Sequence, residues 1–256
     1  MSRPAPEPSH SDTPEPSRGI ELSIVIPAYR QSGRIQQDIA GVQAILKTLS
    51  LIYEIIVVID GSDDDTLAHA NNCASASVRV FGYAVNRGKG YAVRFGFRHA
   101  TGKIIGFIDA GGDINPLGIA TAVRVLLETG ADVTVGSKRH PMSHVRYPTL
   151  RRLYSFAYQK LVKILFDFDL KDTQTGLKVF RRDVVIAALP HMTIDRFAFD
   201  VELLAIIRRL GFRIFTESPV DVRLIFPSSI GGIRPIIRML ADTVSTAWRL
   251  HRLRSS

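Results

Sequence analysis

Short apolar runs alternate with segments of helical periodicity through the first half of this chain, and this alternation constrains the fold most. Helices are predicted between the runs, for example from Ile35 to Leu49, where apolar residues recur at helical spacing. Strands joined through helices pair in parallel, and strands apolar on both faces need cover on both sides. The sequence therefore predicts an α/β fold with a mostly parallel central sheet and helices on both faces. The predicted strands are Leu22–Ile26, Glu54–Ile59, Val78–Phe81, Lys103–Ile108 and Asp132–Val135.

The second half is less repetitive but continues the same domain. Helices are expected over Pro148–Phe168 and Phe199–Leu210, and strands over Lys178–Phe180 and Phe212–Thr216. No linker interrupts the chain after the start, so one domain is predicted over residues 20–230. Residues 1–19, rich in Pro, Ser and Glu, are expected to be a disordered tail. Residues 231–256 read as a basic amphipathic helix, which either lies on a membrane or packs on the core.

Polar and glycine-containing segments follow three of the predicted strands. They are Pro27–Tyr29, Asp60–Ser62 and Asp109–Asp113. Ligands of parallel α/β sheets bind beyond the carboxyl ends of the strands, where these segments meet. In the third segment, carboxylates suit Mg²⁺ or Mn²⁺ and glycines let a diphosphate approach the backbone. The alternative is a solvated turn in which Asp and Gly serve only the backbone geometry.

The charge balance points to an anionic partner. The 256 residues carry a formal net charge of +9, with a pI near 9.9. Phosphorylated substrates, anionic membrane surfaces and nucleic acids all fit this charge. No nucleic-acid-binding motif is present, so we expect no nucleic-acid partner. The single cysteine, Cys73, excludes a disulfide framework, and no run is long and apolar enough to span a bilayer. We expect a cytoplasmic protein that is able to rest on a membrane.

Several motifs, in order along the chain, carry a resemblance to a known family. They are Leu-Ser-Ile-Val-Ile-Pro-Ala-Tyr (22–29), Glu-Ile-Ile-Val-Val-Ile-Asp-Gly-Ser (54–62), Asn-Arg-Gly-Lys-Gly (86–90) and the 107–113 segment. The chain resembles the family 2 glycosyltransferases of the GT-A fold. Asp-Thr-Gln-Thr-Gly-Leu-Lys-Val-Phe (172–180) and Phe-Asp-Val-Glu-Leu (199–203) are similar to the dolichyl- or polyprenyl-phosphate branch, nearest its β-glucosyl-transferring type.

Three positions depart from the pattern that the resemblance implies. Arg30 and Gln31 stand where the family often has Asn-Glu, and Ile59 stands where it often has a first acid. Gly111 occupies the second acidic position of the usual Asp-x-Asp metal motif. We expect Asp109 to bind the metal, and Asp113, two residues after Gly111, is a candidate second ligand.

The resemblance also implies a donor site. Asp60 is expected to accept a hydrogen bond from the base or ribose of a nucleotide. Lys89 opens a helix whose N-terminus faces phosphate, although a solvated basic loop is the alternative. The expected nucleotide-sugar-binding residues are Pro27, Ala28, Tyr29, Asp60, Gly61, Lys89, Asp109 and Ala110.

A second set of residues is expected to hold the acceptor phosphate. Arg151 and Ser155 have helical i, i+4 spacing and share a face, while Lys138 and Arg139 follow Gly-Ser. The resemblance implies that such residues bind the phosphate of a polyprenyl phosphate. The alternative is a solvated basic helix face.

Three acids are the expected catalytic residues: Asp109, Asp172 and Asp200. A phosphate monoester is largely dianionic at pH 7, so it needs little help from a base. Asp200 is therefore expected to orient the acceptor or sugar, with a helix N-cap as the alternative. The role of Glu202 stays open.

The resemblance implies an inverting sugar transfer from a UDP- or GDP-linked sugar to polyprenyl phosphate, at the cytoplasmic face of a membrane. Glucose from UDP-glucose is the expected donor, with GDP-mannose as the rival. Other glycolipid or glycan acceptors remain alternatives. The altered metal motif also leaves open an inactive nucleotide-sugar-binding partner of a membrane protein complex.

Overall fold

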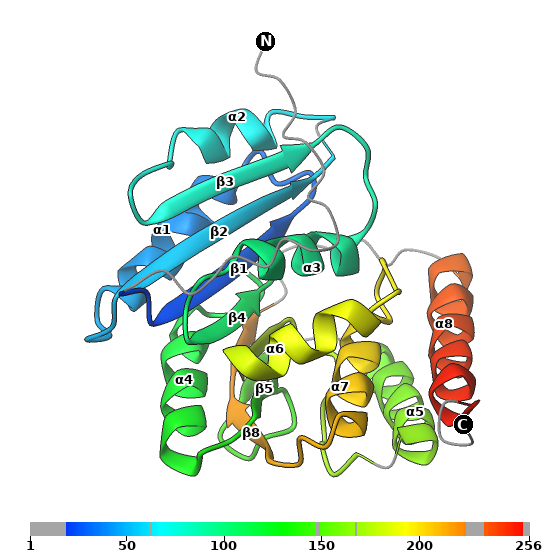
Figure 1. Ribbon diagram of the computed structural model, residues 1–256. Helices are drawn as coiled ribbons and strands as arrows, with labels where there is room; N and C mark the ends of the chain where they lie inside the picture. The colour runs from blue at the N-terminus through cyan, green and yellow to red at the C-terminus, as the bar shows by residue number, and fades with distance from the viewer. Residues whose placement is uncertain (1–18, 62, 147–148, 167, 224–232, 253–256) are drawn as a thin grey trace.

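A seven-stranded sheet forms the centre of the protein, as the computed structural model shows (Figure 1). The structure describes residues 19–61, 63–146, 149–166, 168–223 and 233–252. The expected tail therefore lies outside the described residues, except for Gly19. The strand order is β3-β2-β1-β4-β7-β5-β8. The strands are β1 (Leu22–Ala28), β2 (Tyr53–Asp60), β3 (Val78–Tyr83), β4 (Ile104–Ile108), β5 (Val133–Ser137), β7 (Leu177–Arg181) and β8 (Phe215–Pro219).

The sheet is mostly parallel, as predicted. Only β7 runs antiparallel, between β4 and β5, and the other described pairings in the sheet are parallel. Strand β8 begins at Phe215, three residues later than expected. The predicted strands agree best with the structure where both faces of a run are apolar, because such a run is typical of a strand buried on both sides of a sheet.

Helices cover both faces of the sheet, and each face has its own core. In β2, Ile55, Val57 and Ile59 enter one core while Ile56 and Val58 enter the other. The first core is covered by α1 (Ile35–Leu46), α2 (Thr66–Asn71) and α4 (Leu117–Thr129). The second is covered by α3 (Lys89–His99), α6 (Arg182–Ala188) and α7 (Phe199–Arg209), with the one-turn η1 (Leu189–His191) after α6.

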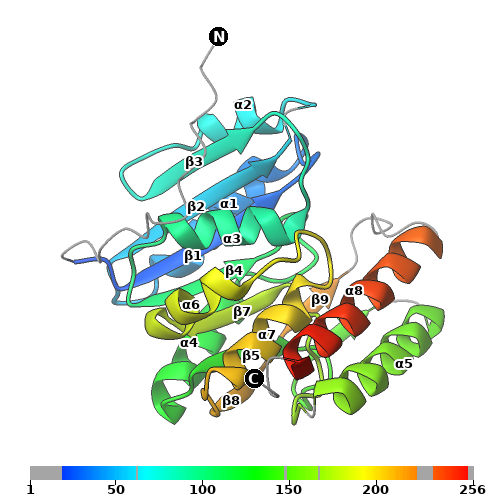
Figure 2. The ribbon, with the colours of Figure 1, turned by 45° about the vertical axis from the view of Figure 1, so that its right-hand side comes forward.

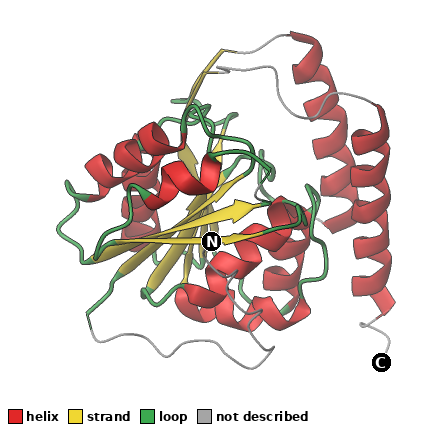
Figure 3. Ribbon diagram, turned by 90° about the horizontal axis from the view of Figure 1, so that it is seen from above, coloured by secondary structure: helices red, strands yellow, loops and turns green. Residues whose placement is uncertain are grey.

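Two long helices stand side by side at one edge of the molecule (Figure 3). They are α5 (Thr149–Phe166) and α8 (Ile233–Arg252). The Tyr158 hydroxyl and Thr243 Oγ1 lie 2.7 Å apart between them. Figure 2 shows α8 alongside α7 as well, so the C-terminal helix packs against both α5 and α7.

A second, two-stranded sheet was not predicted. It pairs β6 (His144–Arg146) with β9 (Asp221–Arg223) in parallel. Each strand has three residues, too short for a period-2 pattern to be recognised. The isolated bridge between Ile114 and Val222 ties this small sheet to the loop that follows β4.

Candidate active site

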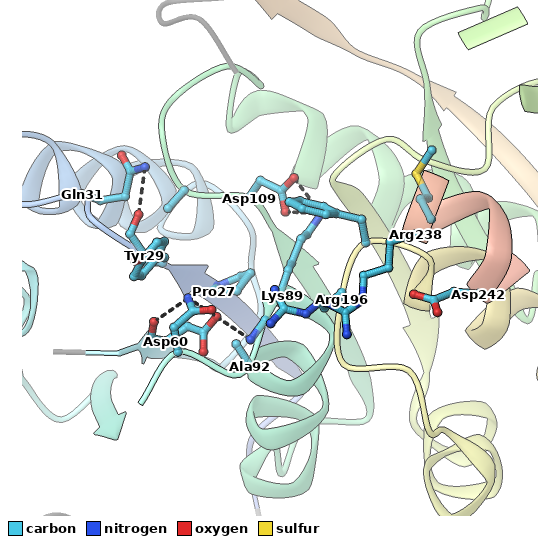
Figure 4. Close-up of a pocket in the computed structure, with 16 residues that line it drawn as sticks. Pro27, Tyr29, Gln31, Asp60, Lys89, Ala92, Asp109, Arg196, Arg238 and Asp242 are labelled. Carbon is cyan, nitrogen blue, oxygen red and sulfur yellow. Dashed lines mark hydrogen bonds and ion pairs between the residues drawn. The ribbon is translucent and has the colours of Figure 1, made fainter. Parts of the chain in front are cut away.

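The carboxyl ends of β1, β2 and β4 meet at one cleft of about 520 Å³, shown in Figure 4. All but one of the expected nucleotide-sugar residues line it. The exception is Gly61, which adjoins Asp60 with a φ of +98° that favours glycine. The lining residues are Pro27, Ala28, Tyr29, Gln31, Asp60, Asn86, Gly88, Lys89, Ala92, Asp109, Ala110, Arg196, Phe197, Arg238, Met239 and Asp242.

Asp60 holds the loop that leads into α3. Its carboxylate accepts hydrogen bonds from the backbone N–H groups of Arg87 at 2.7 Å and Gly88 at 2.9 Å. The Asn86 amide donates to the same carboxylate at 3.0 Å. The side chain is thus committed to shaping the wall of the cleft. Its expected contact with a nucleotide stays a prediction.

Tyr29 stands at the rim of the cleft rather than inside it. Its hydroxyl donates to Asp63 at 3.1 Å, and Arg30 pairs with the same carboxylate at 2.6 Å. Arg30 has a φ of +52°, so the chain turns sharply just after β1. Arg30, which stands where the family often has Asn, therefore builds a small polar cluster with Tyr29 and Asp63.

Asp109 is placed at the end of β4 by a close backbone contact. Its N–H donates to the Gly176 carbonyl at 2.9 Å, and a Cβ at Gly176 would overlap the Asp109 carboxylate. The Lys89 ammonium lies 2.8 Å from each carboxylate oxygen. Desolvation in the cleft raises the pKa of Asp109, and Lys89 opposes that rise. Residue 176 therefore has to be glycine if the Asp109 carboxylate is to keep this position.

Lys89 belongs to a chain of alternating charges. Its Nζ lies 3.8 Å from Asp200 Oδ2, and Asp200 Oδ1 accepts from Lys178 Nζ at 2.5 Å. Burial lowers the pKa of Lys178, whose side chain is fully inaccessible. Burial also opposes the charge of Lys89, but Asp109 and Asp200 outweigh it and raise the pKa of Lys89. Asp200 does not line the cleft; its carboxylate links two lysines.

The turn after Asp109 is fixed by α1. The Gly111 N–H donates to Asp38 at 2.7 Å, and Arg34 pairs with Asp38 at 3.2 Å. Burial raises the pKa of Asp38, against the opposing effect of the Gly111 hydrogen bond. Asp113 does not line the cleft; its carbonyl accepts from the backbone N–H of Arg223 at 2.8 Å. Its expected metal role stays a prediction.

Asp172 organises the 172–176 loop away from the cleft lining. It pairs with Lys138 at 2.8 Å and accepts from the Thr175 hydroxyl at 2.6 Å. Burial acts to raise its pKa, but Lys138 and Thr175 hold the pKa of Asp172 below its usual range. The loop that presents Gly176 to Asp109 thus depends on this ion pair, which supports a positioning role for Asp172.

The expected acceptor-phosphate residues are distributed over two regions. Lys138 is paired with Asp172, and Arg139 lies in the turn after β5, where its N–H donates to Ser137 Oγ at 3.3 Å. Arg151 and Ser155 lie on α5, but their side chains fall outside the described part of the structure. Neither Lys138 nor Arg139 lines the cleft.

The far wall of the cleft was not anticipated from the sequence. Arg196 and Phe197 come from the 192–197 segment before α7, and Arg238, Met239 and Asp242 come from α8. These residues lie after the strand-end motifs and follow no strand. The one indication in the sequence was that these far-wall residues lie next to the Phe-Asp-Val-Glu-Leu motif or within the basic C-terminal helix.

Glu202 explains why this wall is rigid. Its carboxylate accepts from the backbone N–H groups of Thr193 at 3.0 Å and Ile194 at 2.9 Å. Arg249 of α8 pairs with the same carboxylate. Fully buried Glu202 therefore ties α7, the 192–197 segment and α8 together, which answers the role left open by the sequence.

The metal-ligand atoms available in the cleft fit a cation that is coordinated largely by the phosphates of a substrate. Asp109, with a side chain 34% exposed, is the acid that faces the cleft at the end of β4. Within the described residues, no three His, Cys, Asp or Glu side chains gather as a metal-binding group. Mg²⁺ is often held by one or two carboxylates together with substrate phosphates, which matches this arrangement.

A mostly parallel sheet with a charged cleft at its strand ends, bounded on its far side by α8, defines an α/β protein of the GT-A type. The chain belongs to the glycosyl transferase family 2, whose model matches residues 23–188.

Curated relatives extend over most of the chain. A dolichyl-phosphate beta-glucosyltransferase of Saccharomyces cerevisiae is 30% identical over 92% of this chain and 75% of its own length. The protein of that name from Dictyostelium discoideum is 29% identical over 94% of this chain and 78% of its own length.

Solved structures share the fold. Glucosyl-3-phosphoglycerate synthase of Mycobacterium tuberculosis, crystallised with Mn²⁺, UDP and phosphoglyceric acid, superposes with a TM-score of 0.70 at 21% identity, covering 91% of this chain and 78% of its own. Mannosyl-3-phosphoglycerate synthase of Rubrobacter xylanophilus has a TM-score of 0.72 at 18% identity, covering 92% and 75%.

Proposed function

We propose that the protein transfers glucose from UDP-glucose to a dolichyl or related polyprenyl phosphate, with inversion at the anomeric carbon. The observation that carries the proposal is the meeting of Asp60, Lys89 and Asp109 in one cleft at the strand ends. Relatives that cover over nine tenths of the chain are named for this reaction with a dolichyl phosphate. Glucose is preferred over mannose because those relatives are glucosyltransferases.

The reaction exchanges one phosphate ester bond for another. An oxygen of the acceptor phosphate attacks C1 of glucose, the bond from C1 to UDP breaks, and UDP leaves with the bonding electrons. The acceptor is largely dianionic at pH 7, so no strong base is needed. Lys89 offsets the charge that develops on the leaving diphosphate, a role supported by its position in the cleft beside Asp109. Asp200 acts by holding Lys89 and Lys178 in place.

Asp109 is the residue proposed to hold Mg²⁺ or Mn²⁺. When bound, such a cation supplies Lewis-acid neutralisation of the diphosphate. A structural neighbour was crystallised with Mn²⁺ and UDP, which supports divalent-metal use in this fold. Asp113 remains a proposed second ligand. In this chain, Asp109 pairs with Lys89, so the ammonium has to share or yield that carboxylate when a cation binds.

Contact with a membrane is proposed through α8. No described helix is long and apolar enough to cross a bilayer. However, α8 exposes an apolar stripe of Ile237, Val244 and Trp248, whose exposed fractions are 58%, 50% and 58%. Arg252 stacks over Trp248 at 3.6 Å, which places a cation beside the stripe. Such a surface suits anionic headgroups at a cytoplasmic membrane face.

Sugar transfer from a panel of UDP- and GDP-sugars to a short-chain polyprenyl phosphate tests the proposal. We expect product with UDP-glucose, loss of product in EDTA and loss in Asp109→Ala. Asp183→Ala, an exposed acid on α6, is the matched control and retains activity. Binding of UDP-glucose without transfer to any acceptor would instead indicate a binding protein descended from the fold.

A further inference from the structure

Two arginines on the far wall of the cleft have no carboxylate partner in the part of the chain that the structure describes. Arg196 and Arg238 both line the cleft, and both are exposed. Figure 4 shows them approaching the cleft from the side opposite Pro27 and Tyr29. Asp242 follows one turn later on α8 but forms no ion pair with either arginine among the described residues.

Two lysines that were expected to bind phosphate are already paired with carboxylates. Lys89 is paired with Asp109, and Lys138 is paired with Asp172. Lys89 is the lysine that lines the cleft, so the two exposed guanidinium groups are the cleft cations without a carboxylate partner among the described residues, and they favour binding of an anion. Arginine presents several N–H groups in a fixed plane, which suits the oxygens of a phosphate.

The backbone that carries Arg196 is fixed before any ligand binds. The carbonyl of Asp195 accepts from the Tyr91 N–H at 3.0 Å, and the Asp195 carboxylate pairs with Arg94. At Gly90 a Cβ would lie 2.6 Å from the Ile194 carbonyl oxygen, so the segment lies directly on α3. This placement lowers the entropy lost when Arg196 orders around a ligand.

The backbone that carries Arg238 is held to the same support. Its helix, α8, is tied by Arg249 to Glu202, which also accepts from the N–H groups of residues 193 and 194. The Tyr158 hydroxyl anchors the middle of α8 through Thr243. The two arginines therefore approach the cleft from elements joined through one buried carboxylate.

We propose that Arg196 and Arg238 form the subsite for the phosphate monoester of the acceptor, an inference that rests on the proposed sugar transfer. The donor wall is formed by Pro27, Tyr29 and Asp60, whereas the arginines stand across the cleft from it. Arg238 adjoins Ile237, the first residue of the exposed apolar stripe on α8. A phosphate bound between the arginines thus has a path for an attached hydrocarbon chain along that helix.

Steady-state kinetics and binding test this subsite in the full-length protein. In Arg196→Gln and Arg238→Gln, we expect the KM for a short-chain polyprenyl phosphate to rise by about tenfold or more, the ratio for one lost charge-assisted hydrogen bond. The KM for UDP-glucose and the Kd for UDP stay within about twofold of the wild type, because the donor wall is unchanged. Arg238→Lys recovers part of the loss. Arg213→Gln, before β8 at the opposite end of the sheet, is the control and leaves both KM values unchanged.

Calorimetric titration with the polyprenyl phosphate and with phosphoglyceric acid tests the phosphate subsite independently of the identity of the acceptor. Weaker binding of either phosphate in both Gln variants supports the subsite. In another outcome, the wild type glucosylates phosphoglyceric acid and not the lipid, with a raised KM for that acid in both variants. That result supports the subsite and excludes the lipid as the acceptor. Unchanged acceptor KM and binding in both variants, or a loss confined to UDP affinity, overturns the subsite. Failure of the wild type to bind either phosphate also overturns it.

Discussion

The substitution Asp200→Asn distinguishes a structural ion pair from a catalytic acid. Lys178 is fully buried, and its ammonium has two close acceptors in the described structure: Asp200 Oδ1 at 2.5 Å and the Thr175 carbonyl at 2.8 Å. The asparagine variant keeps the shape of the side chain but removes the carboxylate charge that is paired with this ammonium. Breaking a buried ion pair from one side costs about 3–5 kcal/mol, because the remaining charge is left uncompensated. That is a large part of the ~5–15 kcal/mol that stabilises a folded protein.

Urea unfolding of the full-length protein measures the loss, with the slope m expected to stay constant. The matched control is Asp183→Asn, which breaks an exposed pair with Arg181 and costs about 1 kcal/mol or less. The double variant Asp200→Asn/Lys178→Met removes the stranded charge, so we expect it to be more stable than Asp200→Asn. A loss below about 1 kcal/mol in Asp200→Asn, or strict additivity in the double variant, would show that Asp200 does not compensate a buried charge on Lys178.

Three further outcomes follow from the contacts of the site. Gly176→Ala forces the Asp109 carboxylate to move, and we expect Mn²⁺ affinity in the presence of UDP, measured by EPR, to fall about 10- to 100-fold; unchanged affinity would show that the contact is dispensable. Lys89→Met frees Asp109, so the nucleotide-free protein binds Mn²⁺ more tightly while turnover falls; weaker Mn²⁺ binding would contradict the competition. Asp172 has a lowered pKa despite burial because Lys138 favours its charged form, so its stabilising effect is present above about pH 4 and is lost as the pH falls further. The stability gap between wild type and Asp172→Asn, followed by urea unfolding, therefore narrows on acidification, and a constant gap would contradict this assignment.

The sheet and the near wall of the cleft were predictable because they depend on local patterns. Apolar runs such as Glu54–Ile59 fix a buried strand, and the polar residues that end those runs share one edge of a parallel sheet. Asp60, Lys89 and Asp109 therefore come together as expected. The reversed direction of β7 was not predicted, since a short apolar strand carries no record of its direction.

The far wall was not predictable because it depends on pairings between distant residues. Glu202 and Arg249 are far apart in sequence, and no periodicity indicates that they meet. The same is true of Asp172 and Lys138, whose pairing joins an expected catalytic acid to an expected phosphate-binding lysine. Charge alone predicts that a buried acid or base will form an ion pair, but the fold determines which residue is its partner.

The anomeric configuration of the sugar in the lipid product shows directly whether transfer occurs by a single displacement. NMR of the product formed from UDP-glucose and a short-chain polyprenyl phosphate would report it. We expect a β-linked glucosyl phosphate, since direct attack at C1 inverts the α-linked glucose of the donor. An α-linked product, or release of free glucose without glycolipid, would contradict transfer by a single displacement in this cleft.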